Sequence, residues 1–392
     1  MTKKIYLDHN STSPLSSGVL EAMLPYLNEE YGNASSITQM GQRTRKAVED
    51  ARKTLAHFIG AEDPDEIVFT SCATESNNMA IKGTLDAYHS KGRRIVSSSI
   101  EHASVRNILY HLAEKGQIDH VVTPVQQDGL INLEAFEESL TPDTILVSMM
   151  AVNNETGVIQ PIQEIAKMCK EKEVLIHSDA VQAAGKICID VKEWGVDLLS
   201  LSAHKFGGPK GVGLLYIRKG TQLESLLHGG RHEKNRRAGT ENVAGIVGMA
   251  KAAEIAQKRI SNNTHVKELR DFLEEKVTSQ ISHTFVNGHQ EKRISNTSNI
   301  CFDYTDSSSL LMALDLKGVS CSNGSACATG SVEASHVLLA MGLPQHQAHA
   351  ALRLSLGPST TGEEISMTIE ALKNCVQRIR DTHPLWRELV NK

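Results

Sequence analysis

Several features that would place this chain in a specialised class are absent from its sequence. No apolar run is long enough to span a membrane, and the N-terminus reaches Ile5-Tyr6-Leu7 without the apolar segment of a signal peptide. The seven cysteines are scattered and include no Cys-x-x-Cys pair, so the sequence suggests neither a disulfide framework nor a thiolate zinc site. Together these absences predict reduced thiols and a cytoplasmic location.

The sequence also lacks a strong excess of either charge. Lys and Arg number 41 against 46 Asp and Glu, and the resulting net charge of -5 argues against direct nucleic-acid binding. There is no internal repeat, low-complexity tract or Pro-rich linker. A composition of 40% hydrophobic and 22% charged residues is that of an ordinary soluble protein. Its 392 residues suffice for one large domain and a smaller one.

What the sequence does contain is a regular alternation of short apolar runs and helical patterns. We expect helices over 75–89, 104–115 and 162–172, and strands over 66–70, 94–97, 144–150, 174–177, 196–201 and 211–217. Strands separated by helices predict an α/β fold with a mainly parallel sheet. Ligands of such sheets bind beyond the carboxyl ends of the strands.

The pattern changes after an Ala-rich helix expected over 241–260. Helices over 266–279 and 308–316, and a strand over 297–302, predict a smaller α+β domain. We therefore predict a large domain over 15–260. The small domain would consist of 1–14 and 261–392 and would carry the loop around Cys327.

Lys205 has unusual surroundings for a lysine. It lies in Ser202-Ala203-His204-Lys205, directly after an apolar strand and before the glycine-rich stretch 206–211. A partly desolvated lysine amine has a lowered pKa and can attack an aldehyde to form a Schiff base. This chemistry suggests pyridoxal phosphate (PLP) as cofactor. On this stretch alone, a solvated surface lysine is an equally good interpretation.

Other polar groups also follow predicted strands. The stretch 71–78 opens a helix after a strand, which suits a phosphate, although capping by Thr74 with Asn77 is the simpler alternative. Asp179 could hold a protonated pyridine nitrogen, or it could only cap a helix. Gln182 and Asn154 could donate hydrogen bonds to a ring oxygen.

Further along, His102 could stack on a flat ring or shuttle a proton, although a lone histidine is more often structural. The basic stretch 236–242 could contact phosphate or form a solvated turn. His228 and His232 are separated by glycines that would break a metal-binding helix, so we expect no metal site.

Two residues of the C-terminal region complete the candidate set. Cys327 lies among small polar residues in a loop expected over 320–331, which suits an exposed nucleophilic thiolate. Arg353 is a single charge in an apolar run, which suits either a clamp on a substrate carboxylate or a buried ion pair.

Taken in order over nearly the whole chain, these motifs resemble the NifS/IscS-type cysteine desulfurases. The resemblance rests on Asp8, 32–36, Thr70-Ser71-Cys72-Ala73-Thr74-Glu75, Glu101-His102, Asn153-Asn154-Glu155, Asp179-Ala180-Val181-Gln182, Ser202-Ala203-His204-Lys205, 237–242, Gly324-Ser325-Ala326-Cys327 and Arg353. It implies PLP fold type I, with a seven-stranded type of sheet between helices. It also implies the branch of the family that has a long catalytic loop and passes sulfur directly to scaffolds.

The resemblance implies a role for each matching residue. Lys205 would bind PLP covalently, Asp179 would pair with its ring nitrogen, and His102 would stack on the ring. Gln182 and Asn154 would bind the ring hydroxyl, and Arg353 with Asn154 the substrate carboxylate. The phosphate would be held by Ala73, Thr74, Ser202 and His204, with Thr240 supplied by the other subunit of a homodimer.

The reaction implied is conversion of L-cysteine to L-alanine, with a persulfide formed on Cys327 and passed to a sulfur-acceptor protein. The acceptor remains open among an iron–sulfur scaffold, a tRNA-thiolation protein and a DNA-modification partner. Two other functions also remain open: a β-lyase or aminotransferase of the same fold, in which Cys327 is dispensable, and a non-catalytic sulfur-handling scaffold.

Overall fold

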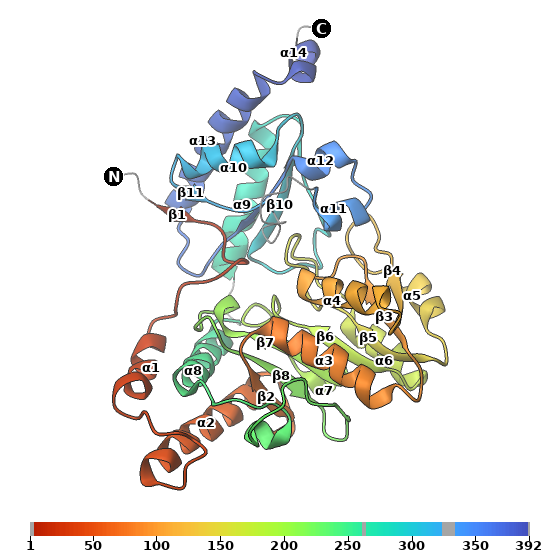
Figure 1. Cartoon of the computed structure of the whole chain (residues 1–392). Coiled ribbons are helices and arrows are strands. Elements are labelled where there is room, and N and C mark those ends of the chain that lie inside the picture. The colour runs from red at the N-terminus through yellow and green to blue at the C-terminus, as the bar shows by residue number, and fades with distance from the viewer. Residues whose placement is uncertain (1–3, 261–263, 324–333, 391–392) are drawn as a thin grey trace.

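The computed structural model describes residues 4–260, 264–323 and 334–390. A large body built on one sheet lies below a smaller body in Figure 1, and the N-terminal segment runs from the smaller body into the larger one. The expected α/β class with an additional α+β region is confirmed. The division at 15–260 against 1–14 and 261–392 stays a prediction.

The large body is organised by a seven-stranded sheet in the order β2-β8-β7-β6-β5-β3-β4. Its strands are β2 (Ile67–Thr70), β3 (Arg94–Ser98), β4 (Asp119–Thr123), β5 (Thr144–Ser148), β6 (Leu175–Asp179), β7 (Leu198–Ser202) and β8 (Gly213–Ile217). Strands β3 to β7 are parallel, and β8 is antiparallel to both of its neighbours. The mainly parallel sheet is therefore confirmed.

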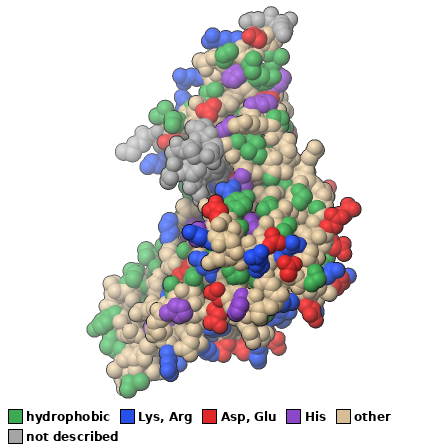
Figure 2. Space-filling model, turned by 45° about the vertical axis from the view of Figure 1, so that its right-hand side comes forward, with side chains coloured by type: hydrophobic (Ala, Val, Ile, Leu, Met, Phe, Trp, Pro, Cys, Tyr) green, Lys and Arg blue, Asp and Glu red, His purple; other side chains and the backbone are tan. Residues whose placement is uncertain are grey.

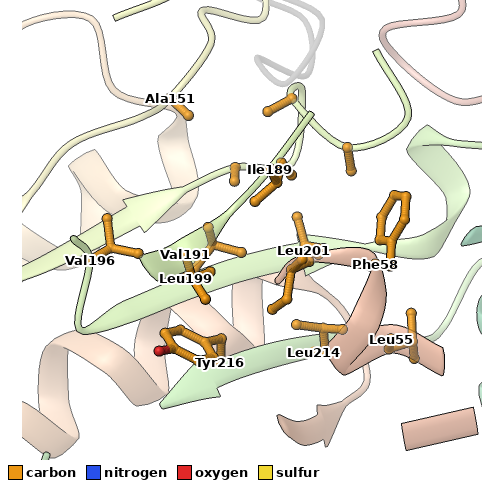
Figure 3. Close-up of a cluster of buried hydrophobic side chains, with 14 of the residues drawn as sticks. Leu55, Phe58, Ala151, Ile189, Val191, Val196, Leu199, Leu201, Leu214 and Tyr216 are labelled. Carbon is orange, nitrogen blue, oxygen red and sulfur yellow. The ribbon is translucent and has the colours of Figure 1, made fainter. Parts of the chain in front are cut away.

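Helices cover both faces of this sheet because its strands are apolar on both sides. In β8, Leu214 and Tyr216 belong to one buried cluster, and Leu215 and Ile217 belong to the other. The first cluster, shown in Figure 3, packs against α2 and α8, and the second packs against α3 and α4.

The helices of the large body are α1 (Val19–Asn28), α2 (Gln39–Phe58), α3 (Ala73–Tyr88), α4 (Ala103–Glu114), α5 (Leu133–Ser139), α6 (Ile162–Glu171), α7 (Val191–Trp194) and α8 (Val243–Ile260). Short 3-10 turns lie at Pro64–Glu66, Ala203–Lys205 and His232–Asn235.

Strand β4 and helix α5 are among the elements that were not predicted from the sequence. Strand β4 reads Asp119-His120-Val121-Val122-Thr123, is mostly half-exposed, and pairs only with β3. An edge strand has a neighbouring strand on one side only, so polar residues are tolerated along it. Its sequence therefore lacks the run of apolar residues from which a buried strand is predicted. The single-sequence pattern could not reveal it.

The smaller body contains two short sheets and the C-terminal helices. Strand β1 (Ile5–Tyr6) pairs in parallel with β11 (Val319–Ser320), and β10 (Thr297–Phe302) lies between β9 (Thr284–Val286) and β12 (Ala351–Ser355). Its helices are α9 (Thr264–Gln280), α10 (Ser307–Asp315), α11 (His336–Ala340), α12 (Gln345–His349), α13 (Gly362–Arg380) and α14 (Pro384–Val390). Its core combines Ile5 and Leu7 with residues after 264, so the N-terminal strand packs with the C-terminal region.

We predict that Leu199→Ala, in the middle of β7, lowers the free energy of unfolding by about 2–5 kcal/mol, because Leu199 is fully buried and truncation leaves a cavity. Leu316→Ala is the matched control, since Leu316 is 84% exposed, and it should change this quantity by less than about 0.5 kcal/mol. Urea unfolding followed by circular dichroism measures both variants. Equal losses for the two would contradict this description of the core.

Candidate active site

A cavity of about 350 Å³ lies at the carboxyl ends of β6 and β7. It is lined by side chains from the large body, from the N-terminal segment and from β12. The lining residues are Asn10, Ser11, Cys72, Ala73, Thr74, His102, Ser104, Met150, Val152, Asn154, Asp179, Val181, Gln182, Ser202, His204, Lys205 and Arg353. Among the described residues, the structure thus brings together every predicted site residue except Thr240.

Lys205 ends the short 3-10 turn that follows β7. Its Nζ donates hydrogen bonds to the backbone oxygens of Asn10, at 2.7 Å, and Ser11, at 2.9 Å. Both acceptors belong to residues 8–13, which we call the N-terminal strap. The amine is therefore held at the cavity by a segment almost two hundred residues away in sequence.

Asp179 ends β6 and is 5% exposed. Its Oδ2 accepts a hydrogen bond from Asn77 Nδ2 at 2.9 Å, and its Oδ1 accepts one from Val181 N–H at 3.1 Å. Asp179 does not cap a regular helix, because the segment after β6 forms only turns. These bonds fix the direction in which the carboxylate faces the cavity.

His102 is the N-cap of α4, and its Nδ1 accepts a hydrogen bond from Ser104 N–H at 3.2 Å. Because Nδ1 is the acceptor, the ring proton of neutral His102 lies on Nε2. Burial lowers the pKa of His102, and the charge of Asp179 opposes this effect. A neutral ring held in one orientation suits stacking against a flat, electron-poor group.

The loop before α3 forms a cradle of polar and backbone groups. Cys72 is the N-cap of this 16-residue helix and makes no side-chain cap bond, so the alternative in which Thr74 is the cap is wrong. Glu75 accepts a hydrogen bond from Ser71 N–H, at 2.7 Å, and Arg237 Nε donates to Glu75 at the same distance. Uncapped N–H groups at a helix N-terminus suit a phosphate.

His204 lies beside Lys205, and its Nδ1 is 3.2 Å from Thr12 Oγ1. Burial, helped by the charges of Lys205 and Lys210, lowers the pKa of His204 to about 4. His204 is therefore neutral at neutral pH and can act as a hydrogen-bonding group for an anion. Ser202, which is 2% exposed, is the last residue of β7 and lines the same cavity.

Arg353 lies on β12 and is 3% exposed. Its Nη2 donates to Asp8 Oδ1 at 2.8 Å and to Ser11 Oγ at 2.7 Å, and its Nη1 donates to the Asn154 backbone oxygen at 3.0 Å. The expected alternative of a buried ion pair is therefore present, although Arg353 also lines the cavity. Among the described residues, its buried Nε has no hydrogen-bond partner.

The two remaining predicted residues are Thr240 and Cys327. Thr240 is exposed on the chain and does not line the cavity. Cys327 lies outside the described residues. The ends of the described chain on either side of its segment do lie near the site: Ser322 pairs with Arg353 through backbone hydrogen bonds, and Ser335 Oγ donates to Glu155 at 2.5 Å.

Sequence reasoning gave no role to Asn10 and Ser11, and it gave Asn77 only a possible role in helix capping. In the structure, Asn10 holds Lys205, Ser11 holds Arg353 and Asn77 holds Asp179. The only available signal was the run of polar residues after the first strand. Hydrogen-bonding partners that come from distant segments cannot be recognised without the fold.

The residues of this cavity fit pyridoxal phosphate. A lysine amine, a fixed carboxylate and a neutral imidazole line one space, and uncapped N–H groups with Ser202 and His204 lie at its edge. These are the groups needed for the aldehyde, the ring nitrogen, the ring face and the phosphate. Asp179 is the one carboxylate among the lining residues, and it lies at the end of β6 rather than at the N-terminus of α3, where the phosphate would bind.

Comparison with known proteins agrees with this chemistry. The aminotransferase class-V family model matches residues 5–367. The chain is 46% identical over 389 residues to a cysteine desulfurase IscS of Dictyoglomus turgidum, covering 99% of this chain and 98% of the relative. A solved NifS-like protein, 37% identical, has a TM-score of 0.90 and covers 96% of this chain and 100% of its own.

A second solved structure, described as SspA in complex with cysteine, has a TM-score of 0.80 and 35% identity. The match covers 92% of this chain and all of that one. Relatives of this similarity over nearly the full length establish both the family and its cofactor. The chain therefore belongs to the aminotransferase class-V family and, within it, to the PLP-dependent cysteine desulfurases.

Proposed function

We propose that this desulfurase transfers the sulfur of L-cysteine to the thiol of Cys327 and releases L-alanine. The observation that carries the proposal is the single cavity lined by Lys205, Asp179, His102 and Arg353. The similarity to a protein solved with cysteine supports L-cysteine as the substrate.

The chain's own residues would hold the cofactor in a defined orientation. Lys205 binds its aldehyde, Asp179 its ring nitrogen, and the N-terminus of α3 with Ser202 and His204 its phosphate. When bound, PLP supplies an electron-withdrawing ring that weakens bonds next to the substrate amine. His102 covers the ring face, and Gln182 and Asn154 donate hydrogen bonds to the ring hydroxyl.

Arg353 is placed to bind the substrate carboxylate. Its Nη atoms are held by Asp8, Ser11 and the Asn154 backbone, so the guanidinium plane is fixed before substrate arrives. The buried Nε retains an unused donor. A fixed guanidinium loses little conformational entropy when it binds a carboxylate.

The sulfur step conserves atoms and electrons. The Cys327 thiolate attacks the sulfur of the bound cysteine, a sulfur–sulfur bond forms, and the carbon–sulfur bond breaks. The electron pair of the broken bond remains on carbon, which takes a proton and becomes the methyl group of L-alanine. Cys327 then carries a persulfide, whose outer sulfur can pass to an acceptor protein.

The partners of this chain follow from the same site. We propose a homodimer in which Thr240 of one chain reaches the phosphate of the other. The exposure of Thr240 away from its own chain's cavity supports this arrangement. We also propose a cytoplasmic location and a sulfur acceptor that belongs to iron–sulfur assembly or thio-modification.

Other surface features give no reason to propose membrane or nucleic-acid partners. Among the described residues, no helix is both long and apolar enough to cross a bilayer. The face shown in Figure 2 mixes basic and acidic side chains over the large body.

Cys327→Ala should keep the yellow colour of bound PLP but lower alanine and sulfide formation by about a thousandfold or more, because the nucleophile is lost. Cys188→Ala, which removes an exposed cysteine, is the control and should retain full activity. Both products are measured from L-cysteine in the presence of a reductant. Unchanged turnover in Cys327→Ala would move the assignment to a β-lyase or aminotransferase, and a colourless wild-type protein would favour a non-catalytic scaffold.

Arg353→Lys should raise the KM for L-cysteine by about tenfold or more, because an ammonium cannot reproduce the planar donors of the guanidinium. Arg43→Lys is the matched control, since Arg43 forms only an exposed pair with Glu30. Initial rates against L-cysteine concentration separate KM from kcat. A KM unchanged in Arg353→Lys would place the substrate carboxylate elsewhere.

Thr240→Ala should weaken PLP binding by about tenfold, the effect of losing one hydrogen bond to an anion. Mixing this variant with Lys205→Ala distinguishes the two possible subunit origins of Thr240. Activity is measured at a PLP concentration that saturates the wild-type protein but not Thr240→Ala. If Thr240 acts across the dimer, a mixed dimer contains one site with both Lys205 and Thr240, and this site has the wild-type affinity for PLP. If the active sites of mixed dimers bind PLP as weakly as Thr240→Ala does, Thr240 does not act in the partner's site.

A further inference from the structure

Lys186 is a second lysine that approaches the cofactor cavity, from behind Gln182. It lies in the turn segment that follows β6. Its Nζ donates to Gln182 Oε1 at 2.5 Å and to Asn10 Oδ1 at 3.3 Å. Both acceptors belong to residues that line the cavity, although Lys186 itself does not line it.

These contacts determine how the Gln182 amide is oriented. The amide has one accepting end and one donating end, and only its oxygen can face the donor groups of Lys186. Gln182 Nε2 then donates to the Asn10 backbone oxygen at 2.9 Å, which uses one of its two N–H groups. The second N–H belongs to a buried side chain at the cavity wall, where an acceptor on the bound cofactor can receive it.

The charges around Lys186 make its position costly. Lys205 and Arg353 both face it, and together with burial they lower the pKa of Lys186 well below its usual value. His9 is also near, and burial together with Lys186 lowers its pKa to about 4. The nearby carboxylate of Asp8 pairs with Arg353, and that of Asp179 accepts a hydrogen bond from Asn77.

Lys186 is half-buried, and burial and the charges of Lys205 and Arg353 both oppose a charged amine at this position. Such groups are found preferentially at functional sites. We propose that Lys186 is a positioning residue of the cofactor site, which holds the Gln182 amide with an N–H group directed to the cavity. This inference rests on the proposed roles of Lys205 and Gln182.

The test is a pH titration of the visible absorbance band of the PLP-loaded protein, without L-cysteine. A hydrogen bond donated to the ring oxygen favours the deprotonated form of the bound cofactor. Lys186→Met removes the group that orients the Gln182 amide, so the pH at the midpoint of this titration should rise by about one unit. Lys186→Ala is a second variant lacking the amine and should show the same shift.

Two controls accompany these variants. Lys186→Arg keeps a donor facing Gln182 and should stay near the wild-type midpoint. A second cavity of about 250 Å³, lined by Lys186 with Phe206 and Arg259, provides space for the larger side chain. Lys192→Met removes an exposed lysine from α7 and should leave the midpoint unchanged.

A double-mutant comparison tests whether Lys186 acts through Gln182. In a Gln182→Ala background, Lys186→Met should produce no further shift, because the amide that it orients is gone. A wild-type midpoint in Lys186→Met, or equal shifts in both backgrounds, would overturn the inference. A wild-type protein with no visible band would overturn both the proposed function and this inference, whereas a normal band with no turnover of L-cysteine would overturn only the desulfurase reaction.

Discussion

The site depends on a buried hydrogen-bond network centred on Asn10. This residue is 1% exposed, and its backbone oxygen accepts hydrogen bonds from both Lys205 and Gln182. Its side chain bonds to Lys186, Asn296 and Thr297, and its N–H donates to Ser355. Buried polar groups are costly unless every one is paired. Asn10 therefore fixes the N-terminal strap, the small body and Lys205 relative to one another.

The two bodies contribute different kinds of group to the cavity. The parallel strands of the large body end in Asp179 and Ser202, and the turn after β7 ends in Lys205, so these side chains are carried by a rigid sheet. The small body contributes Arg353 through β12. Ser11 of the strap accepts hydrogen bonds from both Arg353 and Lys205, and Arg353 also donates to the backbone oxygen of Asn154 in the large body. A substrate that binds Arg353 while it reacts beside Lys205 must contact both bodies, which explains why neither body alone contains a complete site.

The electrostatics of the site favour neutral imidazoles beside fixed charges. Burial lowers the pKa values of His102 and His204, so both rings are uncharged hydrogen-bonding or stacking groups at neutral pH. Asp179 and Arg353 instead keep defined hydrogen-bond partners. With the histidines neutral, the charged side chains that line the cavity are Lys205, Arg353 and Asp179, and a set of both signs suits a dipolar cofactor and an amino acid.

The sequence by itself determined the alternation of strands and helices, because apolar periodicity is a local property of the chain. It also identified Lys205, Asp179, His102 and Arg353, since each follows or lies in an apolar run where a polar residue is unusual. Strand β4 was not predicted because its sequence, as in many edge strands, mixes polar with apolar residues. Only the tertiary structure decided that Asn10, Ser11 and Asn77 hold Lys205, Arg353 and Asp179, and that Lys186 bonds to Gln182. Their roles come from hydrogen bonds between segments far apart in the chain, and such bonds leave no periodic trace in the sequence.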